Sequence, residues 1–104
     1  MKTLFLCSCL FLALTCQTFA QYHVIFDTDI DSDVDDVEAL AMLHTLADQK
    51  TIQFRGVIGT SDDPFAPSCV SAINKYFGRA RLPIGFLKNQ ENLKNHSKYT
   101  RQIA

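Results

Sequence analysis

The chain has 104 residues and a formal net charge of −1 at pH 7, so it can form one small domain at most. Its basic residues form no stripe along the sequence, and this excludes nucleic acid as an expected partner.

Residues 1–20 have the layout of a secretory signal peptide. Lys2 supplies a positive charge, Leu4–Leu14 is an apolar run too short to span a membrane, and Ala20 is a small residue suited to cleavage. We therefore expect a secreted or periplasmic protein that begins at Gln21 and has no membrane association after cleavage. The alternative is an uncleaved N-terminal anchor.

The first element expected in the mature chain is a short buried strand at Tyr22–Phe26. An acidic run at 27–36 follows it directly. A helix is predicted from about Asp35 to Asp48, because apolar side chains such as Leu40 recur at helical spacing. Carboxylates occupy its first turn, where the helix dipole favours them.

A second strand is predicted at Thr51–Gly59. Residues 60–67 contain two carboxylates and two prolines without a regular period, which is typical of a loop. Ser68 is expected to cap a second helix that stops at Gly78. Cys69 falls on the buried face of this helix and is expected to be a small core residue, because signal cleavage removes the other cysteines.

A third strand is expected at Leu82–Phe86, followed by a polar, irregular stretch at 87–96 and a last helix that begins near Ser97. The alternation of strand and helix predicts an α/β fold with an open, mainly parallel sheet and flanking helices, as in Rossmann-like proteins. Ligands bind such sheets at the carboxyl ends of the strands. The acidic run and the loop at 60–63 should therefore share one edge.

The acidic run DTDIDSDVDD admits several interpretations. A solvated turn is the simplest, but the run lies between a buried strand and a buried helix, and so many carboxylates repel one another without a cation. An EF-hand loop at 27–38 would fit the alternate aspartates and Glu38. However, its sixth position carries Ser32 instead of glycine, and a strand precedes it. A phosphatase of the haloacid dehalogenase type would use Asp27 and Asp29, but Asp31 does not suit its motif.

The stretch VIFDTDIDSDVDDVEALAMLHTLAD resembles the N-terminus of the inosine/uridine-preferring nucleoside hydrolases, whose signature is a strand, Asp-x-Asp, a short turn and Asp-Asp opening a helix. GVIGTSDDP and AINKYFGRARLPIG look like the same family. The resemblance implies the nucleoside hydrolase fold, here limited to its first three β-α units over residues 21–104. It also implies a glycosidase that hydrolyses the N-glycosidic bond of nucleosides and binds Ca²⁺, and it is compatible with a homo-oligomer.

The resemblance also implies roles for individual carboxylates. Asp29 would be a calcium ligand and the catalytic base for the attacking water, and Asp36 a second, bidentate ligand. Asp35 would bind the ribose hydroxyls, and Asp27 would support the loop. Asp31 stands where family members carry the turn glycine.

Carboxylates suit calcium, a hard cation with six to eight oxygen ligands, and they stabilise an oxocarbenium-like sugar. Family members draw further ligands and the leaving-group acid from later segments, so the resemblance predicts weak or absent activity for these residues alone. The alternative function is a non-catalytic calcium-binding module.

His44 lies two turns into the first helix, away from the acidic run, and is expected to have a structural or surface role.

Overall fold

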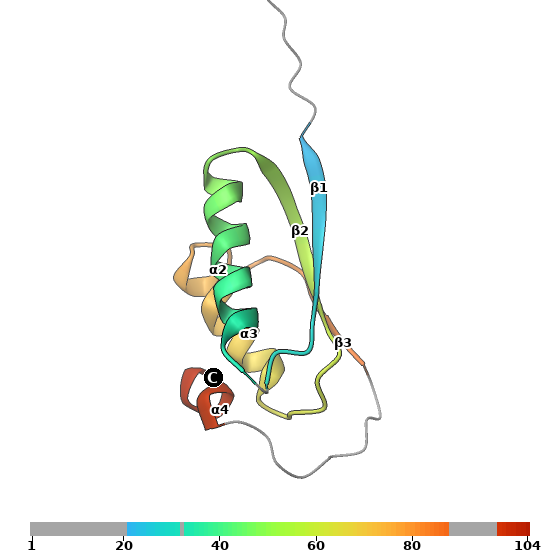
Figure 1. Ribbon diagram of the computed structural model, residues 1–104, viewed down its shortest axis with the longest axis vertical. Coiled ribbons are helices and arrows are strands. Elements are labelled where there is room, and N and C mark those ends of the chain that lie inside the picture. Colours follow the sequence, from blue (N-terminus) through green and yellow to red (C-terminus); the bar gives the residue numbers. More distant parts are fainter. Residues whose placement is uncertain (1–20, 32, 88–97) are drawn as a thin grey trace, which may run out of the picture.

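The computed structural model describes residues 21–31, 33–87 and 98–104. Its elements in chain order are β1 (Tyr22–Thr28), α2 (Asp35–Asp48), β2 (Ile52–Gly59), α3 (Ala66–Tyr76), β3 (Ile84–Phe86) and α4 (Lys98–Ile103). The strands form one parallel sheet in the order β1-β2-β3, which confirms the predicted α/β class (Figure 1). The predicted signal peptide and most of the polar stretch lie outside the described residues.

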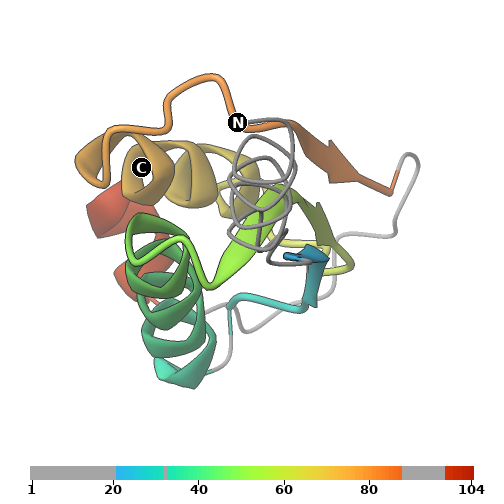
Figure 2. The same cartoon turned by 90° about the horizontal axis from the view of Figure 1, so that it is seen from above.

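Both long helices cover the same face of the sheet (Figures 1 and 2). The strand order explains this, because two successive right-handed crossovers that step in one direction place α2 and α3 on one side. The described helices leave the opposite face open, with Ile25 61% and Ile58 43% exposed. In the described part of the chain, the expected flanking helices therefore cover one face only. None of the described helices is long and apolar enough to span a bilayer.

The core lies between the sheet and the two long helices. It includes Leu40 of α2, Val57 of β2 and Val70 of α3. Cys69 is fully buried, as predicted, and burial raises the pKa of its thiol to about 11, so the sulfur remains protonated at neutral pH. Gly59 packs so closely under the ring of Phe86 that a Cβ atom would overlap the ring.

The prediction that Ser68 caps the second helix is wrong, because α3 begins at Ala66. Pro67 fits the first turn, where a backbone N–H would have no helical partner. The carboxylate of Asp63 accepts a hydrogen bond from the N–H of Phe65 at 2.9 Å, and this turn directs the chain into the helix.

The predicted stop of this helix at Gly78 is confirmed. Gly78 has a φ of 75°, the left-handed conformation that glycine adopts without a Cβ penalty. The N–H of Gly78 donates to the carbonyl of Lys75 at 3.0 Å, and the N–H of Arg79 donates to the carbonyl of Asn74 at 2.7 Å. This pair of bonds is a Schellman motif, which satisfies the last carbonyls of α3.

A buried polar contact joins α2 to α3. His44 is fully buried, and its Nε2 lies 2.8 Å from Oδ1 of Asn74. Its Nδ1 lies 3.4 Å from Nη1 of Arg79. The His44 ring stacks on Phe77 with centroids 4.7 Å apart and meets Phe54 edge-on at 5.2 Å. The role of His44 is therefore structural, in agreement with the prediction.

These partners fix the protonation state of His44. Nε2–H donates to the oxygen of Asn74, and the unprotonated Nδ1 accepts from Arg79, so the neutral ring is satisfied on both sides. A second proton, on Nδ1, would point at the positively charged guanidinium of Arg79. Burial, reinforced by the charge of Arg79, lowers the pKa of His44 below its ordinary value of 6.5, and the bond to Asn74 offsets part of this effect.

Acidification should therefore destabilise the fold. In the unfolded chain His44 gains a proton below about pH 6.5, whereas the folded chain resists this, so the free energy of unfolding should fall as the pH drops from about 7 to 5. Denaturant titrations across this range measure the effect. His44→Gln should flatten the pH dependence, while the matched change His23→Gln at the exposed start of β1 should keep it. Equal slopes in both variants would contradict this assignment.

Candidate metal centre

The carboxyl ends of β1 and β2 bring the two acidic loops to one edge of the sheet, as predicted (Figure 1). The two strands pair in parallel, from Tyr22 opposite Ile52 to Thr28 opposite Gly59. Just beyond the strands, the backbone N–H of Thr60 donates to the carbonyl of Thr28 at 2.9 Å. The acidic run therefore begins beside the loop that follows β2.

Thr28 connects β1, the acidic loop and α2. It is 3% exposed, and its hydroxyl donates to Oδ1 of Asp36 at 2.7 Å. The hydroxyl oxygen of Thr28 also accepts a hydrogen bond from the N–H of Ile30 at 3.1 Å. One buried hydroxyl thus holds the turn closed and orients the carboxylate of Asp36. Thr28 was not among the predicted site residues, although a threonine between two aspartates at a strand end is visible in the sequence.

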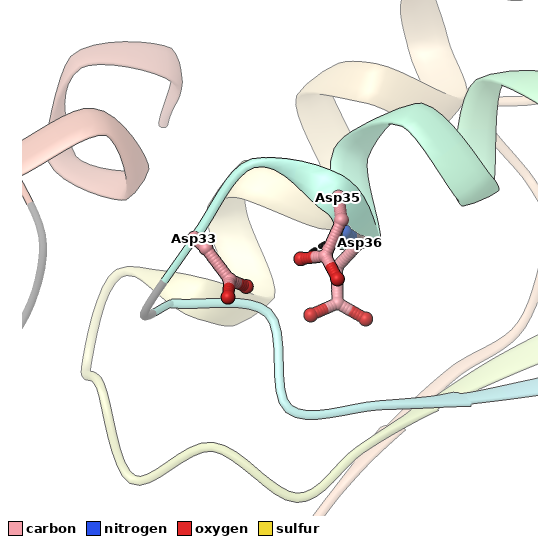
Figure 3. Close-up of side chains that lie close together, drawn as sticks. All are labelled: Asp33, Asp35 and Asp36. Carbon is pink, nitrogen blue, oxygen red and sulfur yellow. Dashed lines mark hydrogen bonds between the residues drawn. The ribbon is translucent and has the colours of Figure 1, made fainter.

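Asp33, Asp35 and Asp36 form the only group of three potential metal ligands among the described residues (Figure 3). One oxygen from each lies within 4.8 Å of the others. Calcium–oxygen distances are about 2.3–2.6 Å, so oxygens up to about 5 Å apart can bind one calcium ion. Asp33 and Asp35 are exposed and Asp36 is partly buried, so solvent can reach the group.

The electrostatics of this group reflect its crowding. A hydrogen bond between the carboxyl groups of Asp33 and Asp35, together with the charge of Asp35, raises the pKa of Asp33 above its ordinary value. The same contact lowers the pKa of Asp35. Asp36 and Asp29 add smaller repulsive contributions at Asp33. A proton or a cation bound between these side chains would relieve the repulsion.

The structure brings together part of the predicted set. Asp35 and Asp36 both belong to the group, and Asp33, which was assigned no role, is its third member. Asp29 lies exposed just beyond β1, outside the group but close enough to affect Asp33 electrostatically. Asp27 is exposed on β1 opposite Ile58, and its carboxylate has no hydrogen-bond partner in the described part of the chain.

The buried carboxylate of the loop after β2, that of Asp63, has a structural role. Asp63 is 3% exposed, and it accepts hydrogen bonds from the N–H of Phe65 and, at 2.5 Å, from the hydroxyl of Thr100 on α4. The latter bond fastens α4 to the start of α3. From α4, the hydroxyl of Tyr99 donates to the carbonyl of Asp33 at 2.7 Å. The last helix therefore supports the acidic loop, a contact that the sequence analysis did not predict.

No protein-family model, curated protein or solved structure matches this chain. The geometry of the acidic loop and the sequence resemblance are therefore the observations that bear on the function of this chain.

Removing the hydroxyl of Thr28 should loosen this loop. Thr28→Val leaves the N–H of Ile30 without its acceptor and frees the carboxylate of Asp36, which should cost about 1–3 kcal/mol of unfolding free energy. Urea denaturation measures this cost. The control is Thr45→Val on the exposed surface of α2, where the hydroxyl bonds only a carbonyl of its own helix. A loss of similar size in the control would contradict a special role for Thr28.

Proposed function

We propose that this chain is a calcium-binding protein of the nucleoside hydrolase type, with its metal centre in the acidic loop after β1. The observation that carries the proposal is the convergence of Asp33, Asp35 and Asp36 within 4.8 Å at the carboxyl edge of a parallel sheet. Ligand sites of open α/β sheets lie at this edge.

Electrostatic repulsion supports a cation at this position. The hydrogen bond with Asp35, followed by the charge of Asp35, raises the pKa of Asp33 above its ordinary value, so ionising both carboxyl groups side by side is unfavourable. The three side chains offer only carboxylate oxygens, which suit a hard cation such as calcium. Sites of modest affinity operate in extracellular modules, and the signal peptide predicted at 1–20 would export the chain to such a compartment.

The element before the loop favours a hydrolase-type site over an EF-hand. An EF-hand places a helix before its calcium loop, whereas β1 leads into this one. The strand, the loop and a helix that opens with Asp35 and Asp36 form the order that the resemblance requires.

In the proposed site Asp36 would hold the calcium ion with Asp33 as a further ligand, whereas Asp29, which the resemblance also makes a ligand, lies outside this group. Bound calcium would lower the pKa of an attacking water. By the resemblance Asp29, which is exposed, would accept a proton from that water. Asp35, which is exposed at the first turn of α2, would bind the ribose hydroxyls. Asp27 would support the start of the loop.

Catalysis should be slow in this chain. A leaving base needs a proton donor, and histidine is the side chain most often used as a general acid or base. Of the histidines in the described residues, His44 is enclosed by Asn74 and Arg79, and His23 lies beside Arg55 at 3.3 Å. Neither is placed at the acidic loop. We therefore expect calcium binding to be readily measurable and nucleoside turnover to be weak or absent.

Calorimetric titration with calcium tests the metal centre. Asp36→Asn keeps the shape of the side chain and its bond from Thr28 but removes the charge, so calcium affinity should fall at least about tenfold. Glu38→Gln is the matched control, since it removes one exposed charge from the same helical turn without touching the three aspartates. Equal losses in both variants, or no binding by the unmodified chain, would refute the calcium site.

Incubation with inosine or uridine in the presence of calcium tests the hydrolase part of the proposal. Slow release of base that disappears in Asp29→Ala and persists in Glu38→Gln would support catalysis by Asp29. Release that is unchanged in Asp29→Ala would contradict that role. Calcium binding without any release would favour the second candidate function, a non-catalytic calcium-binding module.

A further inference from the structure

The two edges of the sheet differ in their protection against pairing with another strand. Among the described residues, β1 and β3 each have one neighbouring strand, β2, so each borders a free edge (Figure 2). β3 is three residues long and Pro83 precedes it directly, and both features limit pairing at that edge. β1 spans seven residues and contains neither proline nor lysine. A long edge strand of this kind is a template for pairing with another chain.

The backbone of β1 presents a row of donors and acceptors to its free edge. The carbonyl of Thr28 accepts the N–H of Thr60 at 2.9 Å, so the backbone groups of Thr28 face β2. Successive residues of a strand direct these groups to alternate sides, and the irregularity in the pairing inserts its extra residue in β2, not in β1. The N–H and C=O groups of His23, Ile25 and Asp27 therefore point outward, where the described part of the chain provides no partner strand.

The side chains of the same three residues lie on the open face of the sheet. Phe26 packs against the core on the helix-covered face, so alternation along the strand places its neighbours on the opposite face. Nε2 of His23 lies 3.3 Å from Nη2 of Arg55, which can only donate, so the neutral ring carries its proton on Nδ1. Within the described ranges, neither this N–H nor the carboxylate of Asp27 has a hydrogen-bond partner, and Ile25 is exposed between them.

We propose that β1 pairs with β1 of a second copy of this chain, in antiparallel orientation and centred on Ile25. Ile25 is the middle residue of the strand, so this register uses its whole length, from Tyr22 opposite Thr28 onward. A two-fold axis at Ile25 places His23 of each copy opposite Asp27 of the other. The outward backbone groups of these residues then form hydrogen-bonded pairs, in which each N–H donates to the opposite carbonyl.

The side chains that meet in this register are complementary. Nδ1–H of His23 can donate to the carboxylate of Asp27 in the second copy, and cross-strand pairs of this kind stabilise an antiparallel ladder. The two exposed Ile25 side chains meet at the axis and remove apolar surface from water. On the other face Val24 lies opposite Phe26, and both are partly buried. A shift of the register by two residues would place Ile25 opposite His23 or Asp27 and lose this match.

The helices leave room for this pairing. A two-fold axis perpendicular to the sheet keeps α2 and α3 of both copies on one face, and α2 packs mainly against β2 rather than β1. The result is a continuous sheet in the order β3-β2-β1-β1-β2-β3. A net charge of −1 on each copy adds little repulsion. The pairing uses neither Asp33, Asp35 nor Asp36, so it does not depend on the proposed calcium site.

Sedimentation equilibrium of the full chain measures the association, in EDTA so that calcium cannot bridge two acidic loops. We expect a monomer–dimer equilibrium. Ile25→Lys places like charges opposite each other at the axis and should weaken the dimer at least about tenfold. Ile58→Lys is the matched control, because it adds the same charge at an exposed position of the same face but on the central strand β2. The control should dimerise like the unmodified chain.

An exchange of two residues tests the register. His23→Asp alone sets carboxylates opposite each other and should weaken the dimer, whereas His23→Asp/Asp27→His restores the pair with its positions exchanged and should recover it. Amide hydrogen exchange gives an independent readout. The N–H of Ile25 should exchange more slowly in concentrated than in dilute protein, whereas that of Phe26, which faces β2, should not change.

A chain that stays monomeric at all concentrations would overturn the proposal, as would equal weakening by Ile25→Lys and Ile58→Lys. Dimerisation without slower exchange at Ile25 would overturn it too, because another surface would then form the contact. Slow exchange at Ile25 that is already present in dilute protein would mean that a strand of the same chain occupies this edge, and would equally overturn it. A failed calcium titration would leave these results unaffected.

Discussion

The parallel pairing of β1 with β2 is the constraint on which the rest of the described structure depends. Parallel neighbours need a crossover, and α2 supplies it by crossing one face of the sheet. The same pairing places both acidic loops at the carboxyl edge and sends the loop that enters β3 to the opposite edge. The topology of the sheet thus decides which loops share an edge, before any side-chain contact is considered.

Local patterns predicted the elements well because each pattern acts over a few residues. The helix at Asp35–Asp48 and the stop at Gly78 follow from periodicity and from the backbone freedom of glycine. The start of α3 could not be predicted in this way. It depends on Asp63, whose carboxylate satisfies the N–H of Phe65 and also bonds Thr100, which is 37 residues further along the chain. No sequence window of helical length contains that partner.

The sequence predicted that aspartates form the candidate site, but it did not predict which aspartates come together. A run of alternating aspartates indicates a cation site, yet the spacing does not reveal which side chains converge once the backbone turns. Asp33 joins Asp35 and Asp36, whereas Asp29 stays near the end of the strand. The contacts that decide this arrangement are non-local. Thr28 reaches Asp36 across the turn, and Tyr99 reaches the carbonyl of Asp33 from 66 residues away.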